Sequence, residues 1–321
     1  MATNLFRLLA MVTLGLLAKQ CVAQESDVER MLNGASSPLD KFENIAVNRK
    51  YATSTSLFDE LTCLFAMEGS KQPQDFGVNA TIGAQASMNL GVPICEAYGI
   101  GAQVGSGMTA SSNAVRVFEL LGETKNRTQN FTTVGLFQRR ESGLSWGFVH
   151  DFLHENYFDR FSLGQWRIRG SYTLTTSDEV GITSHLKSYS DQGTFGSSTP
   201  VTLSPINQGS LYWRRFWESK AQTTAWAGIA DSHGENNAVT GPSPAVKHPF
   251  LLGADVLMPL SPSFAIYGET NLIMPFDTGT VDAFLGIQWY PGRRVALARR
   301  GPYSPLFSLA SPTSFSVDLG Q

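Results

Sequence analysis

The residues that most resemble a catalytic motif are at positions 143–147. Residues 143–147 match G-x-S-x-G, the pattern that places a serine nucleophile on a turn between a strand and a helix. Here the match begins an alternating segment, which predicts a strand instead. His150 and His154 have the opposite parity to Ser145 and would face away from it. His185 could supply a base from another strand, so a barrel-embedded lipase or esterase using Ser145 is the enzymatic alternative.

The same stretch could in principle bind a metal ion. His150 and His154 would share one face of a strand, with Asp151 and Glu155 close by. The sequence contains no H-E-x-x-H pattern, and the neighbouring side chains are mostly aromatic, which is typical of the interfacial girdle of a membrane barrel. We therefore expect no metal, no cofactor and no catalytic activity.

Ionisable residues recur on the polar faces of the predicted strands, and both signs are represented. Such residues set the selectivity of a pore, or pair across a narrow barrel and close it. The polar face predicts a mixed-charge lumen that small polar solutes could enter. Its candidate members are Asp151, Arg167, Arg169, Glu179, His185, Lys187, Asp255, Glu269 and Asp282.

The strand pattern that positions these residues is clearest from Phe76 to Leu90. Every even position there is apolar and every odd position is glycine or polar, which sorts the side chains onto two faces of a strand. The alternation returns in later segments, and a five-residue turn at 259–263 is predicted to bring Met258 opposite Phe264. We predict an all-β fold, a closed antiparallel up-and-down β-barrel of roughly ten to twelve strands over residues 76–291.

Glycines occupy the polar face of the segment that follows. Gly99, Gly101, Gly105 and Gly107 have the spacing G-x-G-x-x-x-G inside an alternating strand. A dinucleotide-binding loop would instead precede a helix. We expect these glycines to let crowded strands approach one another.

Composition agrees with a barrel. The 321 residues carry a net charge of −3, and charged residues make up 16%, against about 25% in soluble proteins. The near-neutral charge gives no reason to expect a nucleic-acid partner. The mean hydropathy is −0.09, and beyond the first residues no apolar run has the ~20 residues of a membrane helix. A membrane location would therefore require a closed barrel.

The two ends of the chain lie outside this pattern. Residues 1–23 resemble a signal peptide, with Arg7 before an apolar run, and predict export. Residues 24–75 are expected to be a polar lead-in, with helical spacing from Leu57 to Phe65 that allows a short helix. Residues 292–321 contain prolines and four arginines, which predicts a solvated tail.

After removal of the signal peptide two cysteines remain, Cys63 and Cys95. Disulfides persist outside the cytoplasm, so these residues form either one bridge or two inert thiols.

Three segments, DFGVNATIGAQ, FVHDFLHENYFDRFSLGQWRIRGSY and FLGADVLMPLSPSFAIYGETNLIMPF, occur in this order before the final SPTSFSVDLG. With them the chain resembles an uncharacterised family of exported, outer-membrane-barrel-like proteins known mainly from planctomycete bacteria. The resemblance covers most of the chain from about Leu64 and implies no activity.

The sequence thus predicts an exported outer-membrane β-barrel, porin-like or structural, in contact with outer-membrane lipid. The remaining alternative is a secreted β-sandwich that binds a partner in the periplasm or at the cell surface, with its apolar faces packed on each other. The oligomeric state is left open.

Overall fold

The computed structural model describes residues 57–140, 142–196, 199–231, 236–237, 241–242, 249–274 and 279–320. The predicted signal peptide and residues 24–56 of the lead-in lie outside the described residues. No helix in the described ranges is long and apolar enough to cross a membrane.

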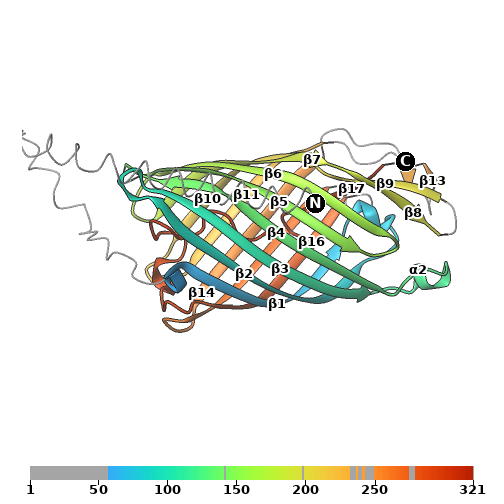
Figure 1. Cartoon of the computed structure of the whole chain (residues 1–321), viewed down its shortest axis with the longest axis horizontal. Helices are drawn as coiled ribbons and strands as arrows, with labels where there is room; N and C mark the ends of the chain where they lie inside the picture. The colour runs from blue at the N-terminus through green and yellow to red at the C-terminus, as the bar shows by residue number, and fades with distance from the viewer. Residues whose placement is uncertain are drawn as a thin grey trace, which may run out of the picture.

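Twelve of the described strands close into one antiparallel barrel (Figure 1), which confirms the predicted fold class. Each strand pairs with its neighbours along the chain, apart from the insertions between β7 and β10 and between β11 and β14, and β16 closes the barrel on β1. The strands are β1 (Leu61–Lys71), β2 (Thr81–Cys95), β3 (Ile100–Asn113), β4 (Asn126–Arg139), β5 (Leu144–Asn156), β6 (Arg160–Thr173), β7 (Asp178–Tyr189), β10 (Gln208–Phe216), β11 (Gln222–Ala230), β14 (Phe250–Pro259), β15 (Phe264–Met274) and β16 (Thr280–Trp289).

The alternation seen in the sequence separates the outside of the barrel from its lumen. On β2, Ile82 and Met88 point outward and are 56% and 58% exposed, whereas Gln85 and Asn89 are buried inside. The outer surface is therefore apolar and the interior polar, the reverse of a soluble protein and the arrangement of a barrel in lipid.

The barrel begins earlier than predicted. The 3-10 helix η1 (Leu57–Glu60) is followed at once by β1, where the sequence suggested a lead-in. The inner face of β1 carries Leu64 and Ala66, which are buried in an apolar cluster. Both faces are therefore apolar from Cys63 to Met67, and the two-residue period is hidden there. Phe76 lies outside any strand: it follows η2 (Pro73–Asp75) with φ of 55° and is buried.

One predicted register, at the turn between β14 and β15, is also wrong. Met258 pairs with Ile266 instead of Phe264, because the ladder continues as far as Pro259, which pairs with Ala265. The Leu260 N–H then donates a 2.8 Å hydrogen bond to the Phe264 carbonyl, which makes the turn tighter than the predicted five residues. The shift is two residues, so every side chain keeps its predicted face.

The two ends of the barrel differ. One end has short turns, including η3 (Glu96–Tyr98) between β2 and β3. The other end carries α2 (Val117–Leu120) and the small strands β8 (Asp191–Phe195), β9 (Thr199–Pro205), β12 (Asn236–Asn237) and β13 (Gly241–Pro242). We call these the short-turn end and the long-loop end.

The C-terminal segment does not form the solvated tail that its arginines and prolines suggested. After η4 (Val295–Leu297) at the short-turn end it contacts the lumen wall, and β17 (Val317–Gly320) pairs with β9 at the long-loop end. Strands β17, β9 and β8 form a three-stranded sheet near the C-terminus (Figure 1). We call residues 298–320 the tail.

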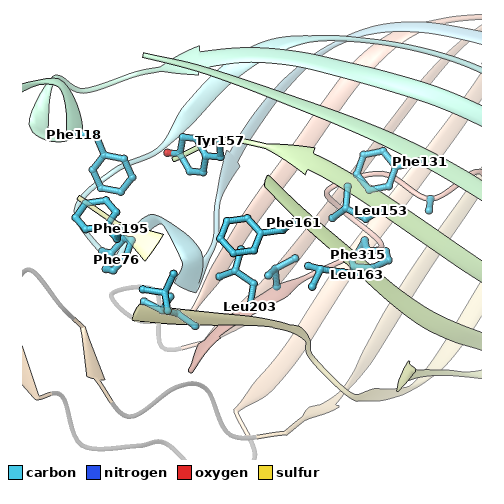
Figure 2. Packing of buried hydrophobic residues seen from close by; sticks show 14 residues of the cluster. Phe76, Phe118, Phe131, Leu153, Tyr157, Phe161, Leu163, Phe195, Leu203 and Phe315 are labelled. Carbon is cyan, nitrogen blue, oxygen red and sulfur yellow. The ribbon is translucent and has the colours of Figure 1, made fainter. Parts of the chain in front are cut away.

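An aromatic cluster covers the long-loop end (Figure 2). Phe76, Phe118 and Phe195 pack together, and the Phe76 and Phe195 ring centroids are 4.4 Å apart. Deeper in the barrel, Phe315 of the tail packs on Phe131 of β4 with a centroid distance of 6.1 Å. The cluster thus joins the loops, the wall and the tail in one apolar core.

Candidate functional site

The lumen is the candidate site because most polar residues predicted from the sequence point into it. Its inner wall is bound to the main chain of the tail. Gln103 donates a 2.7 Å hydrogen bond to the Phe307 carbonyl and accepts one of 3.1 Å from the Phe307 N–H. Asn89 donates to the same carbonyl at 2.9 Å. The N–H and C=O of Phe307 are therefore both bonded by side chains of β2 and β3.

Two arginines continue this contact from another part of the wall. Arg167 donates to the Ser308 carbonyl at 2.9 Å, and Arg169 donates to the Leu306 carbonyl at 3.0 Å. Since a buried carbonyl without a partner is costly, these bonds stabilise the tail inside the lumen.

Gln72 makes a comparable contact towards the long-loop end. Its amide nitrogen donates to the Pro312 carbonyl at 3.1 Å, and its amide oxygen accepts from the Val317 N–H at 3.1 Å. Gln165 of β6 donates to the Ser314 carbonyl at 2.9 Å. The tail is consequently held at several levels of the barrel.

Asp151 and Arg167, two of the predicted lumen charges, form a buried ion pair with each other. Arg167 contacts Asp151 through two hydrogen bonds of 2.6 and 2.9 Å. Asp151 also accepts bonds from Thr133 at 2.7 Å and Gln165 at 2.9 Å. This bidentate geometry with further donors is the arrangement that a buried ion pair requires.

Glu179 is the centre of a second group. Arg214 lies 3.0 Å and Arg169 3.5 Å from its carboxylate, and the Tyr212 hydroxyl donates to it at 2.9 Å. Arg214 and Tyr212 complete this group although the sequence analysis did not select them. Arg214 has the inner parity of β10, the signal that could have identified it.

Two further predicted carboxylates bind the tail. Asp255 pairs with Arg299 of the tail at 2.6 Å. Glu269 accepts a 2.7 Å hydrogen bond from Thr313 of the tail and another of 2.7 Å from Tyr267. The tail therefore supplies one of the cations that neutralise the lumen.

The other three predicted residues differ in their surroundings. Asp282 accepts bonds from Ser70 at 2.6 Å and Gln72 at 2.9 Å. His185 lines a lumenal cavity, whereas Lys187 is exposed at the end of β7.

A buried pair near the long-loop end was missed by the sequence analysis. Arg127 and Glu155 form an ion pair with both side chains almost fully buried. Arg127 also lies over the Tyr157 ring, 5.1 Å from its centroid. Both residues have inner parity on β4 and β5. Arg127 lies in the polar run of residues 123–130, where no alternation of apolar and polar residues marks a strand.

A cavity of about 100 Å³ remains between the wall and the tail. It is lined by Arg167, Arg169, His185, Gln208, Trp226 and Asn271, among others. The side-chain nitrogens Nδ1 of His185, Nε2 of Gln208 and Nδ2 of Asn271 are buried without a protein partner in the described structure. Space of this size accommodates several water molecules, which would satisfy such groups.

The long-loop end has its own buried acid. Asp75 accepts hydrogen bonds from the Gln72 N–H at 2.8 Å and the Tyr157 hydroxyl at 3.1 Å. Burial raises the pKa of Asp75 to about 6, against the opposing effect of Arg127. Through this bond to Tyr157, the carboxyl contacts the apolar core at the long-loop end.

His185, the base predicted for Ser145, lies too far from it. Ser145 is buried on the inner face of β5, and His185 pairs with Arg167, which pairs with Val149. His185 is therefore two strands away and displaced by four residues, roughly 13 Å along the strand direction. That separation exceeds the hydrogen-bond reach that a serine nucleophile needs.

The two histidines of β5 face outward. His150 packs against Phe152 and Trp166 with ring-centroid distances of 4.3 and 4.6 Å, and His154 is exposed. Across the described ranges no group of three or more His, Cys, Asp or Glu side chains could hold a metal ion.

The bridge between Cys63 and Cys95 is not formed, because Cys63 is a free thiol. Cys63 pairs with Met88 on β2, seven residues before Cys95. Seven residues of strand span roughly 23 Å, whereas bridged cysteines have Cα atoms within about 7 Å.

Comparison with known proteins places the chain in a family. Residues 60–317 match the model of a family of unknown function, DUF6666. No curated protein matches the sequence.

Several solved structures are similar in fold. The β domain of the Bordetella autotransporter BrkA is 13% identical with a TM-score of 0.43, over 72% of this chain and 97% of that one. Outer membrane phospholipase A from Escherichia coli is 9% identical with a TM-score of 0.38, over 71% and 95% of the two chains. The KdgM porin is 9% identical with a TM-score of 0.38, over 71% and 98%.

The family match extends from the start of the barrel to the first residue of β17. This match confirms the part of the predicted resemblance that concerns an uncharacterised family. The chain belongs to DUF6666, a family of unknown function, and folds as an outer-membrane-type β-barrel.

Proposed function

We propose that this protein is an outer-membrane β-barrel that its own C-terminal tail keeps closed. The observation that carries this proposal is the set of hydrogen bonds between the lumen wall and the tail main chain, from Ala298 near the short-turn end to Val317 at the long-loop end. A segment held at both ends and between them obstructs the lumen along its length. The resting protein is accordingly a plugged barrel and not an open porin.

The outer surface supports a location in a lipid bilayer. Met67, Leu211 and Leu285 are 65%, 69% and 60% exposed on the outside of the barrel. Trp213 and Trp289 lie near the strand ends on the same surface, where aromatic side chains contact the membrane interface. Export by the signal peptide at residues 1–23 and a planctomycete source remain predictions from the sequence.

The ion pairs of the lumen support the closed state. Asp151, Glu179 and Asp255 each have an arginine partner, so these three carboxylates present no uncompensated charge to a passing solute. Passage of small polar solutes requires the tail to move. We also propose a non-catalytic role, which is supported by the separation of Ser145 from His185.

Conductance of the reconstituted full chain tests the proposal. Folding is first verified on a heat-modifiability gel, and the folded protein is added to a planar lipid bilayer. We expect no conductance above that of the bilayer alone. Stable open-pore steps from the folded full chain would contradict the proposal.

A variant that ends at Leu297 provides the open reference if it gives the same heat-modifiable band. It is expected to conduct. The conclusion depends on the full chain, so it stands whether or not the shortened chain folds.

A further inference from the structure

The wall contacts the main chain of the tail far more than its polar side chains. Within the lumen, the side chains of Arg299 and Thr313 bond to the barrel carboxylates Asp255 and Glu269. The remaining wall-to-tail hydrogen bonds described above end on peptide N–H and C=O groups. Such groups are the same in every polypeptide, so this mode of binding depends little on sequence.

Gln103 is the clearest case. Its side-chain amide donates to the C=O of Phe307 and accepts from the N–H of the same residue, as a neighbouring β-strand would. Gln72 does the same between Pro312 and Val317. Two amides, on β3 and on the connection after β1, thus fix the main chain of the tail in one direction, with a turn at residues 311–315 between the bonds at Phe307 and Val317.

A groove lined by glycines admits the side chains of the tail. A Cβ atom at Gly105 would lie 2.7 Å from Leu309 Cδ1, and one at Gly107 would lie 2.5 Å from Leu309 Cδ2. A Cβ at Gly147 of β5 would lie 2.9 Å from Leu306 Cδ2. Non-bonded carbon atoms do not approach this closely. The inner glycines of β3 and β5 therefore make room for the tail and not only for neighbouring strands.

From these contacts we infer that the lumen is a polypeptide-binding site, which recognises main-chain amides and one aliphatic side chain in the groove of Gly105 and Gly107. The tail is its resident ligand, and a peptide supplied in trans binds the same site once the tail is cut from the barrel. The inference deepens the proposed function and rests on it.

The test begins with the intact, folded chain. A protease site is inserted between Ala296 and Leu297, which are exposed at the short-turn end, and the folded protein is cut there. A fluorescent peptide of residues 301–317 is then added, and its anisotropy and co-elution with the barrel are measured. Retention of the cut fragment and its replacement by the labelled peptide both count as binding, and we expect one or both.

Two modified peptides separate main-chain from side-chain recognition. Replacing every serine in the peptide by alanine, with Thr313 kept because its hydroxyl donates to Glu269, should change affinity by less than about threefold. The serine side chains bond mainly within the tail, at Ser311 and Ser314. N-methylation of the Phe307 amide removes the donor whose bond Gln103 accepts, and should weaken binding about tenfold or more.

Barrel variants locate the site. Gln103→Leu and Gly107→Val should release the fragment or weaken peptide binding about tenfold or more, whereas Gly170→Ala should have no effect. A Cβ at Gly170 has only an ordinary contact, 4.0 Å from Ile182. Gln103→Leu adds no bulk beyond that of the original side chain, so it remains informative if Gly107→Val does not fold.

Three results would overturn the inference: no retained fragment and no bound peptide, equal binding by all barrel variants, or loss of binding by the alanine-substituted peptide. A closed full chain in the conductance assay combined with any of these results leaves the proposed function intact. An open full chain contradicts the proposed function whatever the peptides do.

Discussion

Arg299 connects the tail to the wall by charge, since its guanidinium lies 2.6 Å from Asp255 and its side chain is 16% exposed. It also lies over the Tyr267 ring, 5.1 Å from the centroid. Removing the cation from a largely buried pair leaves a carboxylate without its partner. We expect Arg299→Gln to lower the free energy of unfolding by about 3 kcal/mol, measured as a lower transition midpoint on heat-modifiability gels.

The matched control is Arg293→Gln, the same change at an exposed arginine six residues earlier. It should alter the free energy of unfolding by less than about 0.5 kcal/mol. The double variant Arg299→Gln with Asp255→Asn should regain part of the loss, because the unpaired charge is gone. Equal effects of the two single arginine variants would argue against a stabilising role for the tail.

At the scale of the elements, β17 holds the end of the tail in place by pairing with β9. Asp318 pairs with Ser204 across the β17–β9 ladder. Facing Cα atoms in an antiparallel pair are about 4.5–5.5 Å apart, which suits a disulfide. We expect Ser204→Cys with Asp318→Cys to form an intramolecular bridge under mild oxidation, detected as a mobility shift that a reductant reverses.

The control pair is Thr194→Cys with Asp318→Cys. Thr194 lies on β8, which is separated from β17 by β9, so no bridge is expected. Equal bridging in both pairs would mean that β17 does not occupy its place in the sheet.

At the scale of the whole molecule, the outer surface should respond to charge as a lipid-facing surface does. Leu285 is 60% exposed on β16, and an arginine there would face the bilayer. Leu285→Arg is expected to lower the free energy of unfolding in lipid by about 2–4 kcal/mol, measured by denaturant titration of the reconstituted protein.

Leu120→Arg is the matched control. Leu120 is 82% exposed in α2, outside the barrel wall, so its substitution should cost less than about 0.5 kcal/mol. Equal losses at the two positions would contradict insertion of this surface into a bilayer.

Whether a strand could be predicted from the sequence depended on how clearly its apolar and polar residues alternate. On β2 the alternation of Ile82, Met88 and their polar neighbours was sufficient, because one face meets an apolar surface and the other a polar one. On β1 the alternation was not sufficient. Leu64 and Ala66 pack in an apolar cluster inside the barrel, so the two faces of the strand differ little there.

The wall charges were predicted, but how they pair was not. Parity alone placed Asp151, Arg167 and Asp255 in the lumen, since a strand fixes which face a side chain occupies. Pairing depends on which strands and segments meet across the interior. Arg299 therefore looked like a solvated residue until the structure placed it against Asp255.

The sequence by itself determined the closed antiparallel barrel and its apolar exterior and polar interior, because these follow from a local period of two residues. Only the tertiary structure decided that the barrel is filled. The tail has no period, and its contacts join residues as distant as Gln72 and Val317, 245 positions apart. Such contacts form through main-chain groups that are common to all residue types, so the pattern of side chains does not predict them.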